Sequence, residues 1–187
     1  MNIEKILSDN EKLISKSRKH MEEINDFEHD YNHIKDVVKN VIEIMNNIDE
    51  IFDSEVCIIA AYWHDVGRTV QNENHENISG DMLKLEMEKL EYDKDFIQKC
   101  YDAILFHKWN MTPKTIEGKI VRDADKLAYL GIGRWQSCIE NNQRLDDIIE
   151  LLPNLKNEIL FFDYSKKLYD KEIIKVLKLI YQKLYKI

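Results

Sequence analysis

The chain has 187 residues, of which 44% are hydrophobic, enough for one domain with a sizeable core. Only 5 glycines and 2 prolines are present, so the tight turns of an all-β sandwich or barrel are hard to supply. Charged residues make up 33% of the chain, which argues against a membrane protein, and the regular apolar pattern argues against disorder. We therefore expect one soluble, all-α domain over residues 1–187.

Charge and cysteine content limit the binding partners and the cellular compartment that we expect. The formal charge is −8, from 35 acidic and 27 basic residues, and no basic run stands out, so neither nucleic acid nor a membrane surface is an expected partner. Cys57, Cys100 and Cys138 lie far apart, which favours neither a disulfide framework nor a zinc knuckle. We find no apolar stretch of signal-peptide or membrane-spanning length, and we expect a cytoplasmic protein.

Helices are predicted along most of the chain because apolar residues recur at spacings of three and four. Asp53-Ser54 and Thr112-Pro113 are helix start signals, whereas residues 67–74 lack periodicity and read as a loop. The last helix should break near Tyr169-Asp170. The predicted helices span residues 2–24, 31–49, 54–66, 75–90, 94–107, 113–131, 134–142, 145–151 and 154–186.

The C-terminal helix has one broad apolar face. It can cover the core, which is the commoner use of such a face, or pair with a second copy of the chain. Monomer and homodimer both remain open. The face consists of Ile173, Ile174, Val176, Leu177, Ile180, Tyr181, Leu184 and Tyr185.

The histidines suggest a metal site, because imidazole and carboxylate groups together suit divalent transition metals. Five of the six histidines lie between positions 29 and 107, several beside an acidic residue. His29 and His33, four residues apart, share one helix face, although two half-exposed surface histidines would give the same pattern. The relevant segments are His29-Asp30, His33, His64-Asp65, His75-Glu76 and His107.

The pair His64-Asp65 is more informative, because it ends the apolar run of residues 56–63. A carboxylate buried there needs a cation, and a metal ion is the economical one. Alternatively, Asp65 accepts backbone N–H groups of the following turn. Further on, Asp123 and Asp125 lie in a predicted helix and diverge by about 200° around its axis. Periodicity alone does not decide which of these two faces the site.

Together these segments resemble the HD-domain superfamily of metal-dependent phosphohydrolases, in particular its small bacterial hydrolases. The matching strings are HDYNH at 29–33, AAYWHDVGR at 60–68 and RDADKL at 122–127, within a similar region of about 27–137. The resemblance implies a helical bundle with an interior metal, and its ligands carry over to His33, His64, Asp65 and Asp125. His75 and His107 occupy places where some groups bind a second metal or the substrate. Asp36 departs from the subgroup, which tends to have arginine there.

The resemblance implies hydrolysis of a phosphoester or phosphoanhydride of a small molecule, with a nucleotide as a candidate, assisted by Mn, Mg, Fe, Co, Ni or Zn. A non-catalytic metal- or nucleotide-binding signalling module is one alternative, and a structural helical bundle in which the histidines are only packed is another. The candidate catalytic residues include Arg68 and Lys126, cations for the phosphate, although either could form an ordinary surface pair. The candidate proton donor is His29, with His107 as the other possibility. Trp109 and Trp135 could stack on a base or pack in the core, and Glu117 could orient a ligand or face solvent.

Overall fold

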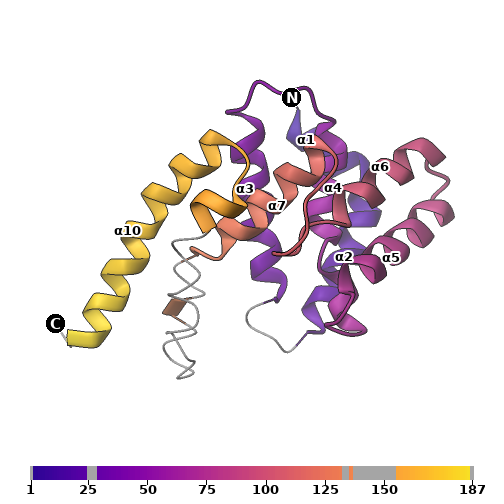
Figure 1. Ribbon diagram of the computed structural model, residues 1–187. Helices are drawn as coiled ribbons and strands as arrows, with labels where there is room; N and C mark the ends of the chain where they lie inside the picture. The colour runs from indigo at the N-terminus through magenta and orange to yellow at the C-terminus, as the bar shows by residue number, and fades with distance from the viewer. Residues whose placement is uncertain (1, 25–28, 132–134, 137–154, 186–187) are drawn as a thin grey trace.

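The computed structural model describes residues 2–24, 29–131, 135–136 and 155–185, and these contain helices but no strand. Figure 1 shows them as a bundle from which the C-terminal helix extends to one side. The all-α expectation is confirmed. The elements are α1 Ile3–Asp9, α2 Glu11–Glu22, α3 Tyr31–Met45, α4 Ser54–Trp63, the 3₁₀ helix η1 Val66–Thr69, α5 His75–Lys89, α6 Lys94–Ile104, α7 Ile116–Ala128, the π-helical turn η2 Leu155–Ile159, and α10 Asp163–Tyr185.

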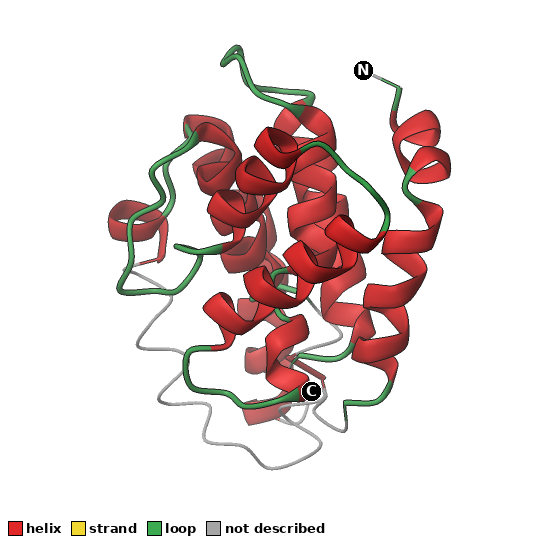
Figure 2. Cartoon of the chain, turned by 90° about the vertical axis from the view of Figure 1, so that its right-hand side faces the viewer, coloured by secondary structure: helices red, strands yellow, loops and turns green. Residues whose placement is uncertain are grey.

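The core is built around α4, which packs against α2, α3, α6 and α7. Six consecutive residues of α4, from Val56 to Ala61, have no solvent exposure, nor does Trp63. The helix can therefore be apolar on all sides, which is typical of an interior helix. Helices α3 and α7 pack against each other and against α4, and α5 and α6 pack against each other as a pair (Figure 1). The view in Figure 2, a quarter turn from that of Figure 1, shows the described residues as helices joined by loops.

Side-chain caps set the starts of several helices. Asp53 accepts the backbone N–H groups of Glu55 and Val56, so α4 begins at the predicted Ser54. The prediction from Thr112-Pro113 is wrong by a few residues: α7 begins at Ile116, because the Thr115 hydroxyl accepts the N–H of Gly118 at 3.0 Å. Each cap satisfies N–H groups that a helix leaves unpaired at its first turn.

The predicted N-terminal helix over 2–24 is two helices, separated at Asn10. The Asn10 side chain donates to Ile6 O at 2.9 Å and to Glu55 Oε1 at 2.7 Å, and it accepts from Tyr92 Oη at 2.7 Å. These tertiary hydrogen bonds hold the residue outside helical geometry, with φ −106° and ψ 16°. Hydrophobic periodicity carries no information about such partners.

Two further boundaries differ from the predictions. The segment predicted as a loop after residue 66 begins with η1, Val66–Thr69. The C-terminal helix does not break at Tyr169-Asp170; the interruption lies at residues 160–162, and α10 runs on from Asp163. Residues 135–136 are helical, and the rest of the predicted helices 134–142 and 145–151 lies outside the described residues.

The apolar face of α10 is divided between core and solvent. Val176 and Ile180 are buried, which confirms core packing for that side, whereas Ile174, Leu177 and Tyr181 each remain more than half exposed. The homodimer stays a prediction. None of the described helices combines the length and apolar content that crossing a bilayer requires.

Candidate metal centre

Five separate segments bring the predicted ligands together. His33 is the third residue of α3, and His64 and Asp65 follow the last residue of α4. Asp125 lies within the buried stretch of α7. His75 is the first residue of α5, and His107 follows the end of α6. All six side chains are buried, and none exceeds 8% exposure as a residue.

The donor atoms of this cluster lie within the reach of one or two ions. Asp125 Oδ1 lies 3.2 Å from His33 Nε2 and 3.8 Å from His64 Nε2. Asp65 Oδ1 lies 3.0 Å from His75 Nε2 and 3.4 Å from His107 Nε2. Three overlapping groups have ligand atoms that all lie within 4.8 Å of one another: His33, His64 and Asp65; His64, His107 and Asp125; Asp65, His75 and His107.

Three of the histidines are oriented in the same way by the backbone. The Nδ1 atoms of His64, His75 and His107 lie 2.8, 2.9 and 2.8 Å from the carbonyl oxygens of the residues three positions earlier. A carbonyl oxygen only accepts, so each Nδ1 must carry the proton and donate. In the neutral ring Nε2 then has a free lone pair, and in all three it points into the cluster. This is the usual arrangement of a metal-binding histidine.

The cluster contains buried polar atoms that a cation would satisfy. His75 Nε2 and His107 Nε2 lie only 3.1 Å apart, so two neutral rings would direct lone pairs at each other and at Asp65 Oδ1. In addition, Nε2 of His33, Nε2 of His64 and Oδ1 of Asp65 are buried without a hydrogen bond. Unpartnered buried polar atoms are costly, and a divalent ion would satisfy them together. The residues present therefore fit a metal ion.

The electrostatics keep the donors in their metal-binding forms. Burial lowers the pKa of His64 to about 3, so this imidazole is neutral at physiological pH. Burial opposes ionisation of Asp65, but positive charge beside it, including the Arg68 guanidinium, holds its pKa well below the usual range. Asp125 behaves in the same way: Lys126 is the strongest of the groups that outweigh its burial and lower its pKa. Neutral imidazoles and ionised carboxylates are the required ligand forms.

Each carboxylate also has a cation beside it. Arg68 Nε lies 2.9 Å from Asp65 Oδ2, and the Arg68 side chain is 18% exposed. Lys126 Nζ lies 2.5 Å from Asp125 Oδ2, and its side chain is only 6% exposed. Both predicted phosphate-binding cations thus lie at the cluster: Arg68 contacts the carboxylate three residues before it, and Lys126 contacts the one directly before it. The His29 ring lies at its edge, with its centroid 6.0 Å from that of His33.

An ion pair beside the cluster was not predicted from the sequence. Glu76 is buried, and its Oε2 lies 2.6 Å from Lys108 Nζ. Each partner directly follows a cluster histidine, His75 and His107 respectively, so the pair ties the start of α5 to the turn after α6. The signal was present as the charged neighbours of both histidines, but sequence does not show that the two segments meet.

Asp123 faces away from the cluster. Its carboxylate accepts the N–H of Phe161 at 2.9 and 3.1 Å and the N–H of Phe162 at 3.1 Å. Burial raises the pKa of Asp123 to about 6. This side chain therefore anchors the chain just before α10 onto α7, and it explains why the C-terminal helix begins at Asp163.

We expect the two aspartates of α7 to respond differently to substitution by asparagine. Asp125→Asn should lose bound metal, because a neutral amide is a poorer donor than a carboxylate. Asp123→Asn should retain metal and lower the free energy of unfolding by about 1–3 kcal/mol, because the charged acceptor of two buried amides is lost. Metal content and thermal unfolding of the two proteins test this, each serving as the control for the other. Loss of metal from Asp123→Asn alone would invert the assignment.

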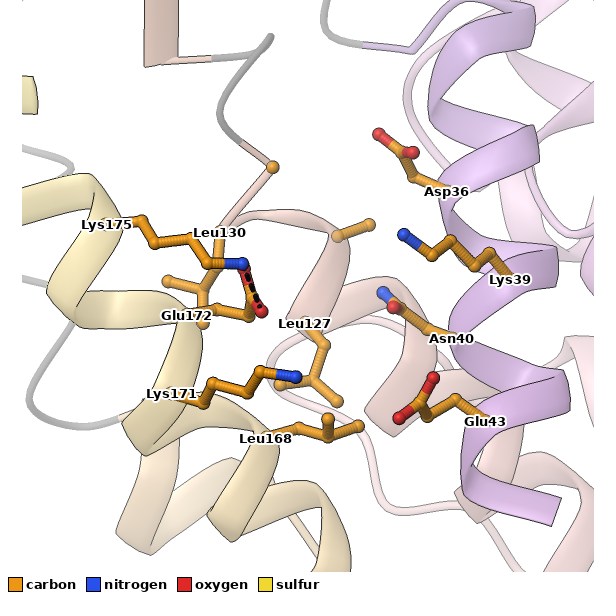
Figure 3. A pocket seen from close by; sticks show the side chains of 12 residues that line it. Asp36, Lys39, Asn40, Glu43, Leu127, Leu130, Leu168, Lys171, Glu172 and Lys175 are labelled. Atoms are coloured by element: carbon orange, nitrogen blue, oxygen red, sulfur yellow. Dashed lines mark hydrogen bonds and ion pairs between the residues drawn. The ribbon is translucent and has the colours of Figure 1, made fainter. Parts of the chain in front are cut away.

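Three other residues raised by the sequence lie in structural roles or away from the cluster. Trp135 is buried, and its Nε1 donates to Tyr129 O at 2.8 Å. Glu117 accepts the N–H of Asp53 at 2.9 Å, so it supports the start of α4 and orients no ligand through that contact. Asp36 lines a polar surface pocket of about 360 Å³ between α3 and α10, whose lining includes none of the cluster residues (Figure 3).

The fold and the buried cluster together define a class: an all-helical protein with an interior site of histidines and aspartates for a divalent metal. The HD domain matches residues 30–130, more than half of the sequence, and the chain belongs to the HD-domain family. Membership supports a metal-dependent phosphohydrolase in general. The fold is similar to that of a predicted HD superfamily hydrolase from an uncultured Thermotogales bacterium, with a TM-score of 0.74, 20% identity, and coverage of 100% of this chain and 99% of the other. No curated protein matches the sequence significantly.

Proposed function

We propose that the chain hydrolyses a phosphoester or phosphoanhydride bond of a small molecule, with nucleotides as the first substrate class to test. The observation that carries this proposal is the set of buried Nε2 and carboxylate oxygen atoms without hydrogen bonds, oriented towards one another in a chain of the HD-domain family. Such atoms are poorly placed for core packing. They are well placed to hold an ion.

We assign the metal to His33, His64, Asp65 and Asp125, with His75 and His107 as donors for a second ion or as contacts to the substrate. A bound divalent ion would lower the pKa of a water molecule and stabilise negative charge on phosphoryl oxygens. His64, His75 and His107 hold their Nε2 atoms ready for it through their Nδ1 hydrogen bonds. No side-chain nucleophile is then required.

The remaining roles fall to cations and to a proton donor at the edge of the cluster. Arg68 is the more exposed of the two cations on the carboxylates, and its other polar contact is a long one, 3.5 Å from Nη1 to Asn72 Oδ1, so its outer N–H groups can turn to a phosphate while Nε stays on Asp65. Lys126 lies deeper and supplies positive charge beside Asp125. His29, adjacent to His33, is our candidate for protonating the leaving oxygen.

The function is tested by a substrate panel with the purified protein. Phosphomonoesters, phosphodiesters and nucleoside mono-, di- and triphosphates are each incubated with metal-depleted protein supplemented with Mn²⁺, Mg²⁺, Fe²⁺, Co²⁺, Ni²⁺ or Zn²⁺. We expect turnover of at least one substrate class that disappears on chelation. Stoichiometric metal binding without any turnover across the panel would favour the non-catalytic binding module instead.

Arg68→Ala should separate substrate binding from metal binding. The guanidinium lies beside Asp65 but is not among the assigned ligands, so the variant should keep its metal while kcat/KM falls about 10- to 100-fold through loss of a charge-assisted contact to phosphate. Steady-state kinetics and metal content check this. Lys84→Ala on the exposed side of α5 is a control for the loss of one positive charge. Unchanged kinetics in Arg68→Ala would remove this residue from the site.

A further inference from the structure

A tryptophan, a lysine and an aspartate form a chain of contacts at the metal centre. Lys126 Nζ lies 4.8 Å from the centroid of the Trp109 ring. The same ammonium lies 2.5 Å from Asp125 Oδ2, and the lysine side chain is only 6% exposed. It is therefore held between an aromatic face and a carboxylate oxygen, largely out of water, where a cation–π contact is stronger than at an exposed site.

Contacts within the protein hold both the backbone and the ring of Trp109 in place. Arg122 Nη2 donates to Trp109 O at 2.8 Å, and the Tyr129 ring meets the indole edge-on at 5.2 Å between centroids. Arg122 also lies over the ring of Phe161, 5.3 Å from its centroid. The indole thus has a defined position without any ligand, and one of its faces is already used by Lys126. Trp109 is half-buried and packs against the apolar core, as one of the two sequence-based interpretations has it, and its face is in addition occupied by Lys126.

The two carboxylate oxygens of Asp125 have different surroundings. Oδ1 lies 3.2 Å from His33 Nε2, inside the histidine cluster, whereas Oδ2 is the acceptor of the Lys126 ammonium. A carboxylate beside a divalent ion can offer one oxygen or both. Here the second oxygen is engaged by a cation that is itself held in place.

We propose that Trp109 is a positioning residue, which holds Lys126 on Oδ2 of Asp125 and so restricts this aspartate to one donor oxygen at the metal centre. The inference rests on the proposed function, because it presupposes a metal ion at Asp125. An oxygen withheld from the ion leaves a coordination position for water or a phosphoryl oxygen, which a catalytic site requires and a structural site does not.

The test compares Trp109→Leu, Trp109→Phe, Lys126→Met and the double variant Trp109→Leu with Lys126→Met. Each protein is titrated with Co²⁺, and its affinity, d–d absorption spectrum and kcat are measured. Lys126→Met removes positive charge near the ion and frees Oδ2, so we expect equal or tighter Co²⁺ binding. The d–d bands should weaken, as they do when the coordination number rises, and kcat should fall about 10- to 100-fold.

Trp109→Leu should shift all three quantities in the same direction as Lys126→Met, by less. Trp109→Phe, which keeps an aromatic face, should stay close to the wild type. The decisive comparison is the double variant: if Trp109 acts through Lys126, adding Trp109→Leu to Lys126→Met changes neither the affinity nor the spectrum further.

Other outcomes would overturn the inference. If Co²⁺ affinity, kcat and the melting temperature of the metal-free protein fall together in Trp109→Leu, the ring serves packing. If only KM for a nucleotide rises, with an unchanged spectrum, the ring contacts the substrate. If the d–d bands of the Co²⁺-loaded Trp109→Leu variant are the same as those of the wild type, the role proposed for Trp109 is wrong, but the proposed metal site is not affected. If the wild-type d–d bands of bound Co²⁺ also persist in His64→Ala, the proposed metal site is wrong, and the role proposed for Trp109 is wrong with it.

Discussion

Replacing His64 by alanine should remove the bound metal and lower the hydrolysis rate to the level of the metal-free protein. His64 has no solvent exposure, and its Nε2 faces both aspartates of the cluster, at 3.7 Å from Asp65 Oδ2 and 3.8 Å from Asp125 Oδ1. No other residue can supply this donor from the end of α4. Metal content by mass spectrometry and phosphate release by the reconstituted protein measure the effect.

The His64→Ala variant should still fold, because the surrounding core is apolar and one imidazole ring makes up only a small part of it. Far-ultraviolet circular dichroism should therefore show near wild-type helicity. His20→Ala is the matched control, because it removes an imidazole that lies against Trp63, 6.3 Å between ring centroids, and none from the cluster. If His64→Ala keeps full metal occupancy and activity, the assignment of the site is wrong.

Gly67→Ala should have the second largest effect, on the fold and the site together. A Cβ atom at Gly67 would lie 2.2 Å from His75 O and 2.7 Å from Ser79 N, both backbone atoms of α5. The start of α5 must move to admit it, and with it the His75 side chain. We expect the free energy of unfolding to fall by about 3 kcal/mol or more, at the upper end of overpacking effects, and metal affinity to fall as well.

Gly80→Ala on the same helix is the control for Gly67→Ala. There an added Cβ would meet the ring of Tyr101 at 2.7 Å, a side chain that can rotate away, so the loss of stability should be smaller. Chemical denaturation of the two metal-free variants compares them directly. Equal stability of Gly67→Ala and the wild type would show that the approach of α5 to the turn after α4 is looser than the structure indicates.

Much of the fold follows from the sequence, because helix periodicity is local. The apolar run of α4, its Asp53 cap and the amphipathic stripes of α3 and α7 each depend on neighbouring residues only. Two of the boundaries that were missed depend on distant partners. Asn10 interrupts the first helix through Glu55 and Tyr92, and the Asp123 carboxylate sets where α10 begins.

The site divides in the same way. The residue types and their order indicated a metal and a family, and the candidate donors do lie together. The relations between segments were not accessible: the close approach of His75 to His107, and the pairing of Glu76 with Lys108, join residues 32 positions apart in the chain. The contact between Lys126 and the Trp109 ring was not accessible either, because a sequence does not show whether a tryptophan stacks on a ligand, packs in the core or contacts a cation.

Anomalous diffraction from crystals of the Mn²⁺- or Co²⁺-reconstituted protein tests the central claim most directly. We expect a strong peak among His33 Nε2, His64 Nε2, Asp65 and Asp125 Oδ1, the atoms that face one another without hydrogen bonds or at ion-pair distance. A second peak near His75 and His107 would indicate a second ion. A peak elsewhere on the molecule, with none in the cluster at full metal occupancy, would contradict the account.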